Sequence, residues 1–244
     1  MKIILVGALG RMGAQIKRVA ESLGHEIVSS VDVGYGENGN GCYKSIKDIN
    51  DKADVIIDFS FHTGTAEVVS YAAEKGIPAV ICTTGHTEDE KKEIFKNAEK
   101  TAILYSGNMS VGIATLCDAV KRVSAAFPDA DIEICETHHN RKLDAPSGTA
   151  LMLFDAVKEV RPYATAVNGR SGHSKREKND VGISSIRMGN IVGIHEVRIC
   201  TDNECITLKH EAFDRALFAD GAIKAAQFII GKPSDLYTMK EMMK

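Results

Sequence analysis

A short apolar run, Lys2–Val6, is followed at once by glycines at positions 7, 10 and 13, and then by a segment with helical spacing, Arg11–Leu23. A strand, a glycine turn and a helix in this order form the context that a dinucleotide-binding fingerprint requires. Gly7 would make the tight turn, Gly10 would let the backbone approach a pyrophosphate, and Gly13 would let the helix pack closely on the strand. The alternative is a glycine-rich turn that binds nothing.

Alternating strands and helices continue through the first hundred residues. Strands are expected at 53–59, 77–82 and 101–105, and helices at 63–75 and 88–100. Such alternation with short connections predicts a doubly wound parallel sheet, in which ligands bind at the carboxyl ends of the strands.

The second strand, 25–32, ends in the carboxylate of Asp32. An acid at this place accepts hydrogen bonds from both ribose hydroxyls and repels a 2′-phosphate. No basic residue follows it directly, so we expect NADH to be the preferred cofactor and NADPH the secondary one. The glycine-rich stretch from 34 to 41 is expected to be a mobile loop.

After residue 112 the pattern changes. A helix over 113–127 and a strand over 131–136 precede strand-like segments with period-two character at 164–167, 183–188, 194–200 and 204–210. The Asp202-Asn203 pair predicts a hairpin between the last two. These segments predict a second, mixed sheet, and the chain ends with an apolar-faced helix over 215–231.

The segment Glu136–Ala150 carries the densest chemistry in the chain. It holds two imidazoles, two cations and two carboxylates before a helix expected over 151–160. Pro146 is expected in the first helical turn, with Asp144 or Ser147 as the cap. The amides of Ser147, Gly148 and Thr149 would then point outward and bind a carboxylate or phosphate.

The expected anion site at the helix N-terminus would be faced by His138, His139 and Lys142. This arrangement indicates a site that both binds an anion and transfers a proton. On spacing alone, a structural or solvated histidine pair before an ordinary helix start explains the same residues.

Composition excludes several classes of function. The 244 residues are 44% hydrophobic and 26% charged, with a net charge of −3 and six cysteines. With this net charge, the chain has no excess of basic residues for binding nucleic acid or a membrane surface. No apolar run approaches the ~20 residues of a membrane span, and the N-terminus is too short and glycine-rich for a signal peptide. The cysteines lack a C-x-x-C pair and zinc spacing, which predicts a reduced, cytoplasmic protein without a metal.

The motif His-His-x-x-Lys-x-Asp-Ala-Pro-Ser-Gly-Thr-Ala, ending at Ala150, resembles the signature of the 4-hydroxy-tetrahydrodipicolinate reductase (dihydrodipicolinate reductase) family. The loops Cys82–Gly85 and Ser106–Met109 are similar to the family's nicotinamide-binding loops, although Cys82 replaces the usual glycine. Further matching segments are Ser184–Arg187, Gly189–Gly193, His195 and Phe218–Ala222.

The resemblance implies an α/β protein: a Rossmann-type doubly wound parallel sheet with an inserted α+β mixed-sheet substrate domain. It implies a dinucleotide-binding domain of residues 1–109 plus 216–244, and a substrate-binding and oligomerisation domain of residues 110–215. The implied activity is NAD(P)H-dependent reduction of 4-hydroxy-tetrahydrodipicolinate, by way of dihydrodipicolinate, to tetrahydrodipicolinate in lysine and diaminopimelate biosynthesis. Relatives tetramerise through the second domain, so a homotetramer is expected.

The resemblance also implies residue roles. His138 and Lys142 are the expected catalytic residues, and His139, Gly148 and Thr149 the expected substrate-binding residues. Asp144 is expected to cap the helix or orient neighbouring groups rather than to react. The expected cofactor-binding residues are Gly7, Ala8, Leu9, Gly10, Arg11, Met12, Asp32, Cys82, Thr83, Thr84, Ser106, Gly107, Asn108 and Met109.

Two other classes remain open from the sequence. A different nicotinamide enzyme, such as an amino-acid or sugar dehydrogenase, would share the two-domain plan but lack the His-His-x-x-Lys motif. A non-catalytic NADH-sensing protein would bind the cofactor without turnover.

Overall fold

The N-terminal apolar run forms a strand near the middle of a seven-stranded sheet, and every strand pair in this sheet is parallel. The strand order is β12-β6-β5-β4-β1-β2-β3. The strands are β1 (Lys2–Val6), β2 (Glu26–Val31), β3 (Cys42–Tyr43), β4 (Val55–Asp58), β5 (Ala79–Ile81), β6 (Ala102–Tyr105) and β12 (Asp235–Tyr237). The predicted doubly wound sheet is therefore confirmed, and β1 and β4 flank its topological switch point.

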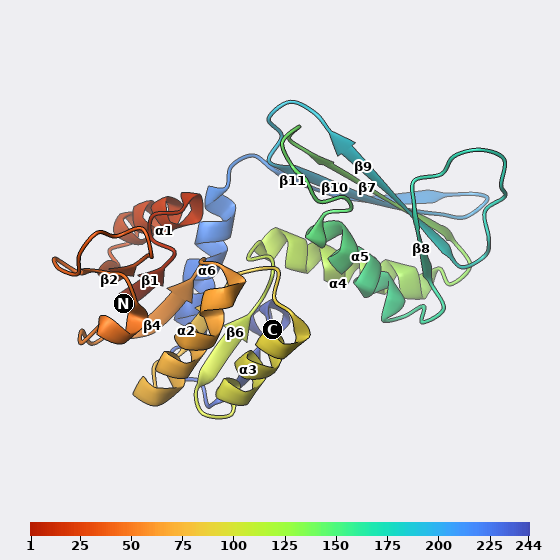
Figure 1. Cartoon of the computed structure of the whole chain (residues 1–244). Helices are drawn as coiled ribbons and strands as arrows, with labels where there is room; N and C mark the ends of the chain where they lie inside the picture. Colours follow the sequence, from red (N-terminus) through yellow and green to blue (C-terminus); the bar gives the residue numbers. More distant parts are fainter. The chain divides into compact units, whose positions relative to one another are not determined.

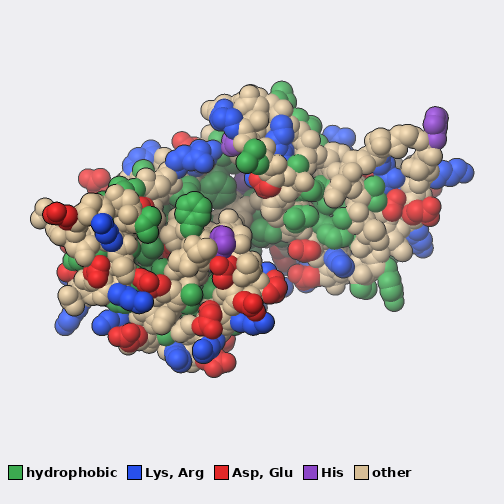
Figure 2. Space-filling view, viewed as in Figure 1, with side chains coloured by type: hydrophobic (Ala, Val, Ile, Leu, Met, Phe, Trp, Pro, Cys, Tyr) green, Lys and Arg blue, Asp and Glu red, His purple; other side chains and the backbone are tan.

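Helices cover both faces of this sheet (Figure 1). They are α1 (Arg11–Ser22), α2 (His62–Lys75), α3 (Glu88–Ala98) and α6 (Ala216–Ile229), with the short η1 (Ile46–Asp48) and α7 (Met239–Met242). Ile4 and Val6 of β1 belong to the core that includes α2 and α3, while Ile3 and Leu5 point to the opposite face. The outer side of α3 carries alternating charges, and Figure 2 shows acidic and basic side chains interspersed there.

The computed structural model describes residues 1–244, and the chain divides into two compact units. Unit 1 comprises Met1–Ser110 and Arg215–Lys244, and unit 2 comprises Val111–Asp214. The chain thus leaves the parallel-sheet unit once and returns to it with α6.

Unit 2 holds a five-stranded mixed sheet of order β11-β10-β7-β9-β8. Strand β10 is antiparallel to β7 and β11, whereas β9 is parallel to β7 and β8. Two helices pack against one face of this sheet (Figure 1). The elements are α4 (Val111–Ala126), β7 (Asp131–His138), α5 (Gly148–Lys158), β8 (Thr165–Asn168), β9 (Asp180–Arg187), β10 (Gly193–Cys200) and β11 (Cys205–Ala212). The predicted mixed sheet is confirmed.

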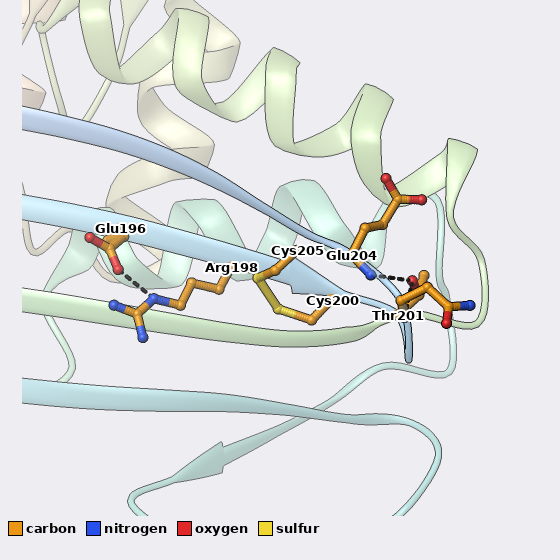
Figure 3. The surroundings of a disulfide bond; sticks show 7 residues. Glu196, Arg198, Cys200, Thr201, Glu204 and Cys205 are labelled. Carbon is orange, nitrogen blue, oxygen red and sulfur yellow. Dashed lines mark hydrogen bonds and ion pairs between the residues drawn. A yellow bond between two sulfur atoms is a disulfide. The ribbon is translucent and has the colours of Figure 1, made fainter.

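The hairpin between β10 and β11 corrects one expectation. Cys200 and Cys205 face each other in the register and form a disulfide with a Cα–Cα distance of 4.0 Å (Figure 3). The amide of Glu204 donates to the Thr201 hydroxyl inside the same turn. The expectation of six reduced thiols is therefore wrong for this pair, because the hairpin brings two separate strand ends together. Cys42, Cys82, Cys117 and Cys135 are free thiols.

No helix is long and apolar enough to cross a membrane. No cluster of three or more histidine, cysteine or acidic side chains is arranged to hold a metal ion.

Candidate active site

The glycine loop after β1 leaves no room for side chains at two of its glycines. Gly7 has φ +78°, and a Cβ there would lie 2.5 Å from the carbonyl oxygen of Phe59. A Cβ on Gly13 would lie 2.5 Å from the carbonyl oxygen of Gly7. Helix α1 begins after Gly10, with no side-chain cap and no acidic residue in its first turn. Its N-terminus therefore presents uncapped amides, which suits a pyrophosphate.

The carboxylate of Asp32 lies beside this loop. It accepts hydrogen bonds from the backbone amides of Leu9 and Gly34, each at 3.0 Å. The glycine loop and the end of β2 are thereby tied together, and the acid is held where a ribose bound at the loop would meet it.

The two predicted nicotinamide loops lie side by side at the carboxyl ends of β5 and β6. A Cβ on Gly107 would lie 3.7 Å from the side chain of Thr84. Ser106 donates to the carbonyl oxygen of Asn108 at 2.8 Å, which closes the second loop on itself. Cys82 is 5% exposed and its Sγ lies 3.9 Å from the carbonyl oxygen of Val80. The thiol that replaces the usual glycine thus points into the protein.

A buried polar network beneath these loops joins the predicted Thr83 to residues for which the sequence predicted no role. Asp58, fully buried at the end of β4, accepts from the amide of Ser60 at 2.9 Å and from the Thr83 hydroxyl at 3.1 Å. His86 lies between the Thr65 hydroxyl at 2.8 Å and the Tyr105 hydroxyl at 3.2 Å. Burial raises the pKa of Asp58, although the hydrogen bonds it accepts oppose this. The network fixes Thr83 against β4.

In unit 2, Glu136 is the centre of a hydrogen-bond network beside the motif. Its carboxylate is fully buried and accepts from His138 Nδ1 at 2.5 Å, from Arg187 at 2.8 and 2.9 Å, and from the amide of Ser147 at 3.1 Å. Burial alone would raise the pKa of Glu136, but the hydrogen bonds from His138 and Arg187 hold it well below its usual range. Glu136 is therefore a carboxylate that joins β7, β9 and the start of α5.

The imidazole of His138 is buried among neighbours that define its orientation. Its ring lies edge-on to the ring of His195, with centroids 5.1 Å apart. A Cβ on Gly193 would lie 3.2 Å from His138 Nε2. Burial, together with the charge of His138, lowers the pKa of His195 to about 3, so His195 is neutral at physiological pH. Nε2 of His195 and the Ser147 hydroxyl lie 3.2 Å apart.

The start of α5 differs from its prediction in three respects. The helix begins at Gly148 rather than at Leu151, and its cap is Ser147, one of the two predicted caps, which accepts from the amide of Ala150 at 3.2 Å. Pro146 precedes the helix instead of lying in its first turn, and its peptide bond is cis. The Ser147 amide donates to Glu136 and does not point outward. Because the buried carboxylate takes this donor, only Gly148 and Thr149 remain of the three amides that were expected to bind an anion.

The loop between β7 and α5 holds the remaining predicted residues. The Lys142 ammonium pairs with Asp144 at 2.8 Å, and its side chain is 22% exposed. Burial would raise the pKa of Asp144, but the hydrogen bond from Lys142 lowers it. The amide of His139 donates to the carbonyl oxygen of Ile191 at 2.8 Å, which fastens the loop to the segment before β10. His138, Lys142, Gly148 and Thr149 thus belong to one local structure.

Comparisons with known proteins agree with this architecture. Residues 1–109 match the family model described as dihydrodipicolinate reductase, N-terminus, and residues 112–243 match dihydrodipicolinate reductase, C-terminus. The chain belongs to the dihydrodipicolinate reductase family. It is 42% identical to the 4-hydroxy-tetrahydrodipicolinate reductase of Clostridium tetani, over 100% of this chain and 97% of the relative. The corresponding protein of Caldanaerobacter subterraneus is 41% identical, over 100% of this chain and 98% of the relative.

Solved structures show the same fold. Dihydrodipicolinate reductase from Paenisporosarcina sp. TG-14, solved with dipicolinate bound, has a TM-score of 0.80 and 22% identity, covering 98% of this chain and 97% of its own. An amine dehydrogenase from Mycobacterium smegmatis has a TM-score of 0.66 and 11% identity, covering 98% of this chain and 95% of its own. The two-unit plan is thus shared with other dehydrogenases, whereas the sequence matches select the family.

Proposed function

We propose that the glycine loop and the two nicotinamide loops of unit 1 bind the reduced cofactor, and that the loop from His138 to Thr149 in unit 2 binds the substrate and supplies a proton. Membership of the family assigns to the chain the NAD(P)H-dependent reduction of 4-hydroxy-tetrahydrodipicolinate in lysine and diaminopimelate biosynthesis. The observation that supports the proposed roles is the single carboxylate, Glu136, that holds both His138 Nδ1 and the cap of α5.

Cofactor binding is proposed for Gly7, Ala8, Leu9, Gly10, Arg11, Met12, Asp32, Cys82, Thr83, Thr84, Ser106, Gly107, Asn108 and Met109. The uncapped start of α1 and the close contacts at Gly7 and Gly13 fit a dinucleotide. Reduced nicotinamide supplies the hydride when bound. The Asp32 carboxylate beside the loop favours a ribose with two hydroxyls over one with a 2′-phosphate, so NADH is the preferred cofactor.

In unit 2, the substrate carboxylates are bound by the His139 imidazole, the Lys142 ammonium and the Gly148 and Thr149 amides. Hydride addition at C4 of the substrate leaves an enamine, and a proton from His138 or Lys142 completes the reduction. The same cations stabilise the negative charge that develops while the hydride is added.

We further propose a homotetramer formed through unit 2, in the cytoplasm. The sheet of unit 2 has α4 and α5 on one face only, and Arg198 of β10, on the other face, is exposed. Light scattering of the purified protein tests the tetramer; a mass of one chain at working concentration would reject it.

One assay separates this function from its alternatives. Fresh product of a dihydrodipicolinate synthase is added to the protein and NADH, and absorbance of the reduced nicotinamide is followed. We expect NADH oxidation that depends on the product, with kcat/KM higher for NADH than for NADPH. NADH binding without oxidation would favour a sensor, and turnover of an amino acid or sugar instead would favour another dehydrogenase.

A further inference from the structure

The Glu136–Arg187 pair belongs to no predicted role, yet it is a deeply buried ion pair beside the motif. Glu136 is 0% and Arg187 18% exposed at the side chain, and Arg187 reaches both carboxylate oxygens. Arg187 also donates to the carbonyl oxygen of Asp144 at 2.6 Å. Its guanidinium is therefore held by Glu136, which precedes the proposed substrate loop, and by Asp144 within that loop.

We infer that Glu136 and Arg187 are positioning residues for His138: the carboxylate holds Nδ1 of the imidazole, and the guanidinium balances the carboxylate's charge. This inference rests on the proposed role of His138 as a proton donor. The carboxylate accepts from Nδ1 at 2.5 Å, so Nδ1 keeps its proton and only Nε2 is left to exchange one. Orientation and tautomer are set by the same hydrogen bond.

The second half of the inference follows from charge balance. An unpaired carboxylate buried against an imidazole would stabilise the imidazolium and oppose release of its proton. The bidentate contact with Arg187 makes the Glu136–Arg187 pair neutral as a whole. Proton release from Nε2 then leaves a neutral imidazole that still donates from Nδ1 to Glu136. No other group has to move for this step.

Other charged or titratable groups near His138 come from several elements. His195 lies on β10 and is neutral, with His210 opposite it on β11. Lys142 and Asp144 form their own ion pair in the loop before α5. His139 is the neighbour in sequence. The Glu136–Arg187 pair is distinguished from these groups by the hydrogen bond between Glu136 and His138 Nδ1.

Two substitutions should move the pH dependence in opposite directions. Glu136→Gln removes the negative charge beside the imidazole and should lower the apparent pKa of the basic limb of kcat/KM. Arg187→Met leaves that charge unbalanced and should raise it. Shifts on the order of one pH unit are expected for charges in contact. Arg187→Lys keeps the positive charge and should restore a limb close to that of the wild type.

Matched controls exist in the same unit. Glu133→Gln changes another glutamate of β7, which pairs with Arg176, and Arg122→Met changes an exposed arginine of α4. Both should leave the pH profile unchanged. The inference would be overturned if the wild type showed turnover but the basic limbs of the two test variants shifted in the same direction or did not shift. The proposed function would still stand in that case. Absence of wild-type turnover would instead overturn the proposed function.

A second measurement needs neither turnover nor a stable variant at position 136 or 187. Nitrogen-15 chemical shifts of labelled histidine, assigned with His138→Gln, report which ring nitrogen carries the proton in the full-length wild-type protein. We expect neutral His138 to be the Nδ1–H tautomer. The Nε2–H tautomer would exclude Glu136 as the group that fixes the ring.

Discussion

At the scale of single residues, the fold restricts the position of the flexible Lys142 side chain. Its backbone amide donates to the carbonyl oxygen of His139 at 3.1 Å, and its ammonium pairs with Asp144 at 2.8 Å. Asp144 is itself 59% exposed, so this ion pair is open to solvent and can exchange for a substrate carboxylate at small cost. A lysine in this setting remains available to an incoming dianion.

Lys142→Ala should therefore act on chemistry more than on cofactor binding. We expect a loss of at least ~10² in kcat, the usual effect of removing a general acid or a charge-stabilising cation. Steady-state kinetics measure this loss, and fluorescence titration should give a near-normal Kd for NADH. Lys158→Ala, at the exposed end of α5, the helix that follows this loop, is the control. Wild-type turnover in Lys142→Ala would remove the residue from the mechanism.

The burial of Glu136 was not predicted, although the residue pattern of β7 contains a signal for it. Ile132 and Ile134 lie on the buried face of β7, and the period of two places Glu136 and His138 on that same face. A carboxylate at a core position needs partners, so this break in the alternation indicates a buried ion pair. The partner, Arg187, comes from β9, and nothing in its local sequence links it to Glu136.

At the scale of elements, the sequence predicted every strand except β3 and β12 and every helix except η1 and α7. Strands β3 and β12 have two and three residues and exist because neighbouring strands offer free edges, which local patterns do not encode. The glycines after β1 predicted a real turn, since Gly7 and Gly13 both face backbone atoms that exclude a Cβ. The Cys200–Cys205 contact required the register of β10 with β11, which only the folded sheet supplies.

The β10–β11 hairpin gives a prediction about thiols. Protein purified without reductant and then denatured should show four reactive thiols per chain, for Cys42, Cys82, Cys117 and Cys135, and reduction should expose two more. Cys200→Ser should destabilise by at most about 2 kcal/mol, because the disulfide closes a short loop. Activity should be unchanged, since Cys200 pairs with Asp131 at the end of β7 opposite His138. Six reactive thiols before reduction would contradict the disulfide.

At the scale of the whole molecule, the residues proposed for cofactor binding and for substrate binding fall in two different compact units. The residues proposed to bind the cofactor lie in Met1–Ser110, and those proposed to bind the substrate lie in Val111–Asp214. Each unit has its own buried core. A change in one loop should therefore be felt first by the ligand of its own unit.

This division predicts separable effects on binding. Without substrate, Asp32→Ala should weaken NADH binding by about tenfold through loss of hydrogen bonds to a charged group, while His139→Ala should leave its Kd within about twofold of the wild type. In turnover, His139→Ala should raise KM for the dicarboxylate, because a carboxylate partner is lost. The Asp32→Ala/His139→Ala double variant should bind NADH as weakly as Asp32→Ala alone, since distant sites act additively. If His139→Ala weakened NADH binding as much as Asp32→Ala, the cofactor and substrate sites would not be separate, and the assignment of one site to each unit would fail.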